Sequence, residues 1–290
     1  MQRPLRVVNF HNPQPRAPYW MFAIAWRRVV FMGLILFLHG MGHDPRKDYW
    51  RDWAGPLREA LVREGVKVAE SNFGGIYYYD LVPGPATENR AGDFFPERQQ
   101  YLDQLKEFAW QQLGSAEKIL PLPTRSLIKQ LVAYIIDNFG DIFTYLHCDL
   151  VYQAVNWRVF ESLLAADQPV YLLGYSLGAM VGYCALQASP PLAGRVVHFM
   201  MLGNPLFWFA NGVARRADLR VRPAVGRWTN LAGFLDIAWP HLVPRLVRGL
   251  DEHVEFIIDR FNPIRGHRAY FTNPASLHTI ARVIAGTWQN

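Results

Sequence analysis

The chain is poor in cysteine and carries no recognisable metal or nucleotide motif. Its 290 residues contain two cysteines, Cys148 and Cys184, which do not form a Cys-x-x-Cys pair. Both fall in segments with a helical pattern, so we expect buried free thiols rather than a disulfide or metal ligands. A His-Glu-x-x-His motif, a cluster of ligand residues and a phosphate-binding loop are also missing. The sequence therefore predicts no metal site and no cofactor.

The excess of positive charge is small. The net charge is +6, and 25 of the 30 basic residues are arginine. Zinc-finger spacing and a platform of basic and aromatic residues are missing, so we expect no nucleic-acid partner. One basic cluster is either a solvated loop or a surface for anionic lipid, and it consists of Arg215, Arg216, Arg220, Arg222 and Arg227. The composition, with 51% hydrophobic and 19% charged residues, is that of an ordinary globular protein and leaves the oligomeric state open.

A clear membrane span or export signal is missing too. Residues 17–38 are long enough to span a bilayer, but Arg27 and Arg28 in the middle would cost roughly 5–7 kcal/mol. The apolar run Tyr19–Trp26 is short for a secretory signal, and prolines crowd it. We expect residues 1–31 to be an N-terminal extension, packed on the domain or lying on a surface, unless the natural start is Met32. A cytoplasmic location is expected, with peripheral membrane contact through this extension as the alternative.

From Leu34 onward, short apolar runs alternate with helical patterns. This alternation predicts an α/β protein whose central sheet is mostly parallel and covered by helices on both faces. Strands are expected at Leu34–Leu38, Val66–Ser71, Val170–Leu173, Val196–Leu202, Trp228–Gly233 and Val254–Ile258. Helices are expected at Trp50–Glu64, Leu177–Ala188 and Pro274–Ala285.

A long stretch separates the second expected strand from the third. It begins with a segment rich in glycine, proline and aromatic residues, FGGIYYYDLVPGP, which predicts a loop. Helical patterns follow at Glu97–Leu113, Thr124–Phe139 and Asp149–Ala165, with a short helical turn from Asp141. One of these helices must cross over within the sheet, and the others form either a helical cap or extra cover for the core. We therefore expect one α/β domain at residues 32–290, with an insertion at about 73–140.

A serine lies between two glycines where a predicted strand meets a predicted helix. The segment Gly174-Tyr175-Ser176-Leu177-Gly178 is a G-x-S-x-G motif, preceded by VYLL and followed by LGAMVGYCALQA. A chain of this length would contain on the order of 0.1 such motifs by chance. The small flanking residues suit a very tight turn that exposes the serine, and strand–turn–helix is the context that this motif requires. We interpret Ser176 as a nucleophile.

A second glycine-rich turn follows the first expected strand, in Phe37-Leu38-His39-Gly40-Met41-Gly42. Such a turn leaves backbone amides pointing toward the carboxyl edge of the sheet. The amide of Met41, together with that of Leu177, would hold a developing oxyanion, and Gly42 is the alternative second donor. We assign His39, Gly40, Gly42 and Tyr175 to substrate binding.

Three segments, FLHGMG, GYSLGA and Gly203–Leu206 (GNPL), resemble the α/β-hydrolase superfamily, in particular its lipase and esterase branches. The resemblance covers the chain from Met32 to the C-terminus. It implies an α/β-hydrolase fold and a catalytic triad in the chain order serine, acid, histidine. It also implies hydrolysis of carboxylic esters without a cofactor.

Five histidines follow Ser176, and they are His198, His241, His253, His267 and His278. His267 lies in a glycine-containing loop between the last expected strand and the last expected helix, where the family carries its general base. The local run Gly266–Tyr270 resembles the family's His-x-x-Tyr stretch, whereas His198 falls inside an expected strand and is a core candidate. We assign the base to His267.

The acid is expected at Asp236, which follows the strand WTNLAG in a segment that resembles the family's acid loop. The match is incomplete, because Gly233, Phe234 and Ile237 stand where related loops often carry a second aspartate or a proline. Asp259 is the main rival, followed by Asp251.

These residues together predict a serine hydrolase that cleaves carboxylic esters of small molecules or lipids through an acyl-enzyme. A thioesterase or acyltransferase with the same triad is one alternative, and a non-catalytic protein that binds a ligand or membrane is another. Several aromatic segments near strand ends would either line an apolar acyl site or pack in the core, and they are Trp50, Trp53, Tyr77–Tyr79 and Phe207–Phe209.

Overall fold

The computed structural model of the chain describes residues 33–42, 45–82 and 140–288, together with residues 100, 103, 104 and 107. The whole of the expected N-terminal extension, residues 1–31, and most of the expected insertion lie outside these residues. The helices expected at Glu97–Leu113 and Thr124–Phe139 are therefore untested. The described residues all belong to the unit Phe31–Asn290.

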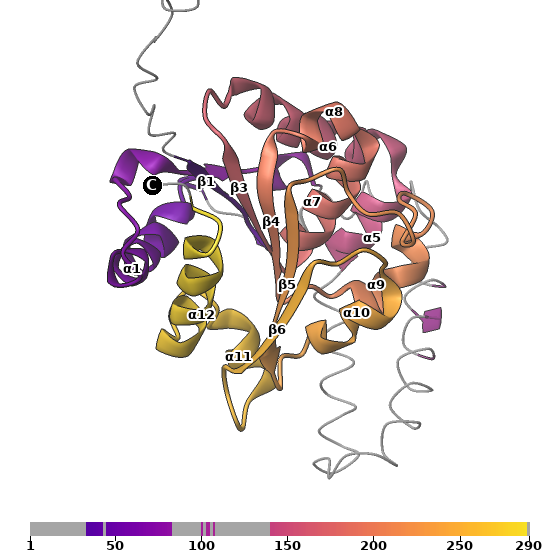
Figure 1. The fold of residues 1–290 in the computed structure, drawn as a ribbon. Coiled ribbons are helices and arrows are strands. Elements are labelled where there is room, and N and C mark those ends of the chain that lie inside the picture. The colour runs from indigo at the N-terminus through magenta and orange to yellow at the C-terminus, as the bar shows by residue number, and fades with distance from the viewer. Residues whose placement is uncertain are drawn as a thin grey trace, which may run out of the picture. The chain divides into compact units, whose positions relative to one another are not determined.

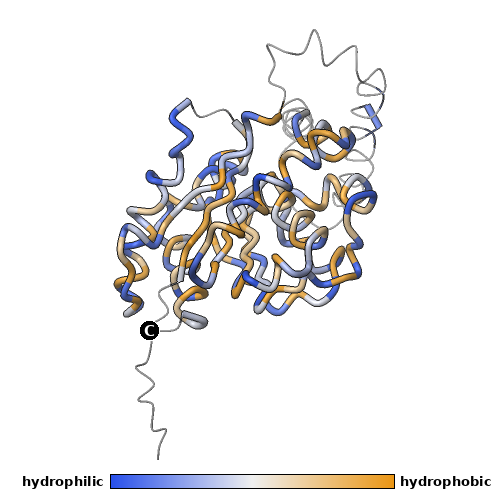
Figure 2. Tube along the Cα trace, turned by 90° about the horizontal axis from the view of Figure 1, so that it is seen from above, coloured by the Kyte–Doolittle hydropathy of each residue, from blue (hydrophilic) through white to orange (hydrophobic). Residues whose placement is uncertain are grey.

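Six strands form one sheet in the order β2-β1-β3-β4-β5-β6, and every pairing between neighbours is parallel. The strands are β1 (Leu34–Leu38), β2 (Phe73–Ile76), β3 (Val170–Tyr175), β4 (Val196–Leu202), β5 (Arg227–Phe234) and β6 (Glu252–Ile257). Strands buried on both faces need continuous apolar runs, and hydrophobic residues predominate along the central strands in Figure 2. The expected α/β architecture with a parallel sheet is confirmed.

Helices cover both faces of this sheet. One face carries α1 (Trp50–Arg63) and α12 (Pro274–Ala285), and the other carries α5 (Gly140–His147), α6 (Asp149–Ala165), α7 (Leu177–Ala188), α8 (Pro190–Ala193) and α9 (Leu206–Val213). Figure 1 shows α1 and α12 together on one side of the strands, with α6 and α7 on the other. Alternate side chains of β1 serve the two layers, because Ile35 and Phe37 pack with α1 and α12 while Leu36 and Leu38 face α7.

The second strand was predicted at the wrong place. Val66–Ser71 was expected to pair, but the strand is FGGI, which the sequence pattern assigned to a loop. Its glycines have a packing role that a pattern of apolar residues does not reveal. A Cβ on Gly75 would lie 2.4 Å from Cδ1 of Trp50, so only glycine lets the first residue of α1 pack over this strand. Instead of continuing a strand, Glu70–Asn72 forms a short 3₁₀ turn.

The other expected elements are found within about two residues of their predicted ends. The helix α6 lies between β2 and β3 in the chain and packs on the sheet, so it is part of the predicted crossover. The short elements η2 (Tyr79–Leu81), η4 (Pro240–Leu242), α10 (Val243–Leu246) and α11 (Pro263–Arg268) lie in the connections. Of the helices in the described ranges, none combines the length and the apolar composition needed to cross a bilayer.

Candidate active site

The candidate residues meet at the carboxyl edge of the sheet. Since all six strands run in the same direction, the loops that follow them gather at one edge, which is where open parallel sheets bind ligands. Ser176 follows β3 and Asp236 follows β5. His267 was expected in a loop, but it lies in the short helix α11, which begins at Pro263 after β6. The glycine-rich segment from His39 follows β1 at the same edge.

Ser176 occupies a strained turn between β3 and α7. Its φ of 53° and ψ of −122° are unusual for a residue with a side chain, and such a conformation costs about 1–3 kcal/mol. The flanking glycines make the turn possible. A Cβ on Gly178 would lie 2.1 Å from the carbonyl oxygen of Leu38, and one on Gly174 would lie 2.7 Å from Cα of Ala179. The sharp turn predicted from the G-x-S-x-G motif is therefore present.

The structure brings Ser176, His267 and Asp236 together in one chain of hydrogen bonds. Nε2 of His267 lies 2.9 Å from Oγ of Ser176, and Nδ1 lies 2.8 Å from Oδ1 of Asp236. Ser176 and Asp236 are each only 2% exposed. A carboxylate only accepts hydrogen bonds, so Nδ1 carries the proton and Nε2 is left to accept from the serine hydroxyl. This is the tautomer that a general base needs.

Tyr270 completes the surroundings of Asp236, and the sequence assigned it no role. Its hydroxyl donates to Oδ2 of Asp236 at 2.7 Å and accepts from the amide of Gly233 at 2.8 Å. The amide of Ala238 donates to Oδ1 at 2.7 Å. Burial, and next the charge of Asp236, raise the pKa of Tyr270 well above its ordinary value, so the phenol stays protonated and keeps donating. The position of Tyr270 three residues after His267 was the only signal in the sequence.

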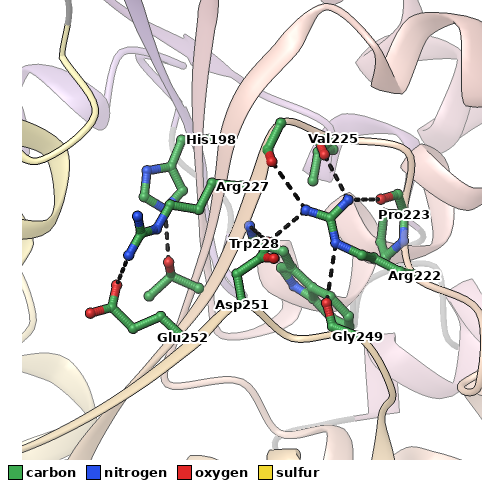
Figure 3. Close-up of polar contacts among 11 residues, drawn as sticks. His198, Arg222, Pro223, Val225, Arg227, Trp228, Gly249, Asp251 and Glu252 are labelled. Atoms are coloured by element: carbon green, nitrogen blue, oxygen red, sulfur yellow. Dashed lines mark hydrogen bonds and ion pairs between the residues drawn. The ribbon is translucent and has the colours of Figure 1, made fainter.

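Both rival acids are engaged elsewhere. Asp259 accepts from the amides of Phe261 and Asn262 and pairs with Arg265, whose hydrogen bond is the first cause of a pKa well below the usual value. Asp251 immediately precedes β6, at the amino edge of the sheet. It accepts from the amide of Trp228 at 2.7 Å and from Arg222 at 2.6 Å, as Figure 3 shows.

The remaining histidines have local partners. His198 is fully buried between the hydroxyls of Thr229 and Thr287, as expected for a core residue, and burial lowers its pKa to about 3. The others lie beside different side chains: His253 beside Asn230 and Glu255, His278 beside Glu64, and His241 beside Trp239.

The two amides expected to bind an oxyanion belong to backbone segments next to Ser176. Leu177 is the first residue of α7, so its N–H is not used by the helix, and the helix dipole favours negative charge there. The segment after β1 passes directly beside the serine, because a Cβ on Gly40 would lie 3.0 Å from Cβ of Ser176. The backbone of Gly42, the alternative donor, is already hydrogen-bonded to the hydroxyl of Tyr79. Met41 is therefore the second candidate.

Two residues assigned to substrate binding make internal contacts. His39 is 5% exposed, and its ring packs 4.5 Å from that of Tyr49 and 4.6 Å from that of Tyr78. The hydroxyl of Tyr175 donates to the carbonyl of His267 at 2.7 Å. These side chains support the segment after β1 and the short helix α11 that carries His267.

The aromatic residues divide between core and site edge. Trp53 stacks on Phe271 at a centroid distance of 4.3 Å, so it belongs to the layer of α1 and α12. Phe207 and Trp239 are half-buried and stack at 5.4 Å in the loops that follow β4 and β5. Trp239, three residues after Asp236 and with a φ of 53°, was not identified from the sequence.

Much of the basic cluster of the sequence holds loops together. Arg222 donates to the carbonyls of Gly249, Pro223, Val225 and Gly226 as well as to Asp251, and Arg227 pairs with Glu252 (Figure 3). Arg216 donates to the carbonyl of Leu146 and to Asp149. These contacts favour an internal role over a lipid-binding surface.

Within the ranges that the structure describes, no group of three His, Cys, Asp or Glu side chains is placed to hold a metal ion. In comparisons with known proteins, no family model and no curated protein matches the chain.

Proposed function

We propose that this protein is a serine hydrolase of the α/β-hydrolase superfamily that cleaves carboxylic esters. The observation that carries this proposal is the continuous hydrogen-bonded chain from Ser176 through His267 to Asp236, with distances of 2.9 and 2.8 Å. Its members come from the ends of three different elements at the carboxyl edge of a parallel sheet, and the serine sits in a strained turn. A serine hydroxyl placed against an oriented imidazole is the arrangement that activates this weak nucleophile.

In the first half of the reaction, Oγ of Ser176 attacks the ester carbonyl carbon while its proton passes to Nε2 of His267. The carbonyl oxygen becomes negative and accepts hydrogen bonds from the amides of Leu177 and Met41, each worth about 2.7–4 kcal/mol in the transition state. The bond to the alcohol oxygen then breaks, and the alcohol leaves with the proton from Nε2. The acyl group stays on Ser176.

In the second half, water attacks the acyl-enzyme and gives a proton to Nε2 of His267. The tetrahedral species collapses, the proton returns to Oγ of Ser176, and the carboxylic acid is released. Asp236 keeps the proton of the neutral imidazole on Nδ1 throughout and stabilises the imidazolium that forms in each half.

An apolar acyl or aryl group suits the surroundings of the site. The stacked pair Phe207 and Trp239 follows β4 and β5 at the edge where Ser176 lies. Half-buried aromatic rings at the sheet edge that carries the nucleophile favour small-molecule or lipid esters over highly charged substrates.

The experiment is a screen of p-nitrophenyl esters from C2 to C16, and of acyl thioesters of the same chain lengths, with the wild type, Ser176→Ala and Ser189→Ala. Ser189 lies just past the far end of α7, about 20 Å along the helix axis from Ser176, so it serves as the matched control. We expect turnover by the wild type and the control and none by Ser176→Ala. Preference for acyl thioesters would assign a thioesterase, and inactivity of the folded wild type on every substrate would favour a binding role.

A further inference from the structure

Three tyrosine hydroxyls hold the segment that follows β1. Tyr78 shares its hydroxyl proton between two carbonyls, that of His39 at 2.8 Å and that of Gly40 at 3.2 Å. The hydroxyl of Tyr49 donates to the carbonyl of Phe37 at 2.7 Å and is also hydrogen-bonded to the backbone of His39. The hydroxyl of Tyr79 is hydrogen-bonded to the backbone of Gly42 and donates to the carboxylate of Asp141. From Phe37 to Gly42, the backbone is therefore fixed at four residues by side chains.

These contacts bear on the two peptide units that flank Met41. A trans peptide unit is planar, and its C=O and N–H point in opposite directions. Holding the carbonyl of Gly40 with Tyr78 therefore sets the direction of the Met41 amide. Holding the amide of Gly42 with Tyr79 sets the next peptide unit, which carries the Met41 carbonyl. The main-chain torsions of Met41 are fixed from both sides.

The surroundings leave this segment little freedom. Tyr78 and Tyr79 are 0% and 1% exposed, and burial is the first cause of the raised pKa of each, so both hydroxyls keep their protons. The start of α7 packs closely on the same segment, because a Cβ on Gly178 would lie 2.4 Å from the carbonyl oxygen of His39. The segment is held between the tyrosines on one side and the start of α7 on the other.

We propose that Tyr78 and Tyr79 are positioning residues that aim the Met41 amide at the oxyanion formed on Ser176. The proposal rests on the proposed serine hydrolase activity and adds to it. Tyr78 orients the donor through the Gly40 carbonyl, and Tyr79 secures the following peptide unit through Gly42. A preorganised donor needs no reorientation as charge develops, which is the source of its catalytic value. The tyrosines act through the backbone and touch no reacting atom.

The test compares Tyr78→Phe and Tyr79→Phe with Tyr171→Phe. Tyr171 is a matched control because its hydroxyl also donates to a backbone carbonyl, that of Thr287 at 2.7 Å, but near the amino edge of the sheet. For each protein, kcat and KM are measured on the best ester, together with Ki for an alkyl boronic acid. The boronic acid forms a tetrahedral adduct on the serine and so reports binding of the transition state.

A misaimed donor should cost less than a deleted one, whose loss lowers kcat about 100- to 1,000-fold. We expect kcat to fall roughly 10- to 100-fold in Tyr78→Phe, and less in Tyr79→Phe, with KM changed by less than about twofold. Ki for the boronic acid should rise by the same factor as kcat/KM falls. Tyr171→Phe should behave as the wild type.

Equal kcat and Ki values for Tyr78→Phe and Tyr171→Phe in an active enzyme would overturn the positioning role and leave the hydrolase assignment intact. An inactive wild type would instead remove the proposed function itself. A fall in kcat without a matching rise in Ki would show general damage and would also overturn the proposal. Thermal unfolding checks that each variant is folded, and Tyr79→Phe decides the question if Tyr78→Phe does not fold.

Discussion

Replacement of Tyr270 by phenylalanine removes one hydrogen-bond donor from the Asp236 carboxylate and leaves the ring in place. Oδ2 of Asp236 loses its 2.7 Å bond, while Oδ1 keeps those from His267 and Ala238. The site is fully buried, so water does not readily replace the lost hydroxyl. A hydrogen bond to a charged group contributes about 1.5–3 kcal/mol, and the bare Gly233 amide adds a further destabilising effect of about 1–3 kcal/mol.

The kinetic consequence is a lower rate. The hydroxyl of Tyr270 fixes the carboxylate that orients His267, so without it the imidazole is held less firmly against Ser176. The lost hydrogen bond of about 1.5–3 kcal/mol sets the ceiling, and since 1.36 kcal/mol is a factor of ten in rate, we expect kcat/KM to fall about 10-fold and by at most about 150-fold.

The assay is kcat/KM at neutral pH for the wild type, Tyr270→Phe and Tyr183→Phe. Tyr183 is a suitable control because its buried hydroxyl donates to the carbonyl of Asp218 at 3.1 Å, away from the triad. Its kcat/KM should equal that of the wild type. An unchanged kcat/KM in folded Tyr270→Phe would refute the reasoning and reduce Tyr270 to a packing residue.

Three further predictions concern the acid, the turn and the pH dependence of stability. Asp236→Asn should lower kcat about 10,000-fold. Asp259→Asn should change kcat by less than about fivefold, because Asp259 forms its hydrogen bonds within its own loop. Steady-state rates measure both, and similar losses in the two variants would contradict the assignment of the acid. Gly178→Ala places a Cβ 2.1 Å from a carbonyl oxygen and should lower the melting temperature. Gly55→Ala on α1 meets nothing within 4 Å and should raise the free energy of unfolding by about 0.5–1 kcal/mol. Calorimetry measures both, and equal effects of the two variants would contradict this reasoning. Burial lowers the pKa of His198 in the folded protein to about 3. Between about pH 6.5 and pH 3 the unfolded chain therefore binds one more proton, and each unit of falling pH lowers the free energy of unfolding by up to about 1.4 kcal/mol. Urea titrations should find a shallower dependence of this free energy on pH in His198→Asn, and an unchanged dependence would rule this out.

Local sequence patterns were sufficient for the elements that build the site. The apolar runs of β1 and β4 and the helices α7 and α12 have the bounds that were predicted. Ser176, Asp236 and His267 were identified because each follows an apolar strand pattern or lies in a loop beyond the last one, and the structure places all three in contact. In a parallel sheet, chain order and strand direction together determine which loops can meet.

Side-chain networks between distant residues could not be predicted in this way. The run Tyr77–Tyr79 was interpreted as pocket lining or packing, but the hydroxyls of Tyr78 and Tyr79 bind backbone near residue 40. Strand β2 was missed because its two glycines reduce the apolar signal, although they are what allow Trp50 to pack closely. Arg222 belonged to a cluster with a surplus of charge, yet its partners are Asp251 and several loop carbonyls that only the fold brings together.

The most direct test of the central claim is covalent labelling with a fluorophosphonate, followed by peptide mass mapping of the folded protein. The account predicts a single phosphonylated residue, Ser176, formed in the wild type and Ser189→Ala and missing in Ser176→Ala. It also predicts that His267→Ala slows labelling strongly, because the hydroxyl then has no base to take its proton. Absence of label from the folded wild type, or label on another serine, would contradict the claim that Ser176 is the nucleophile.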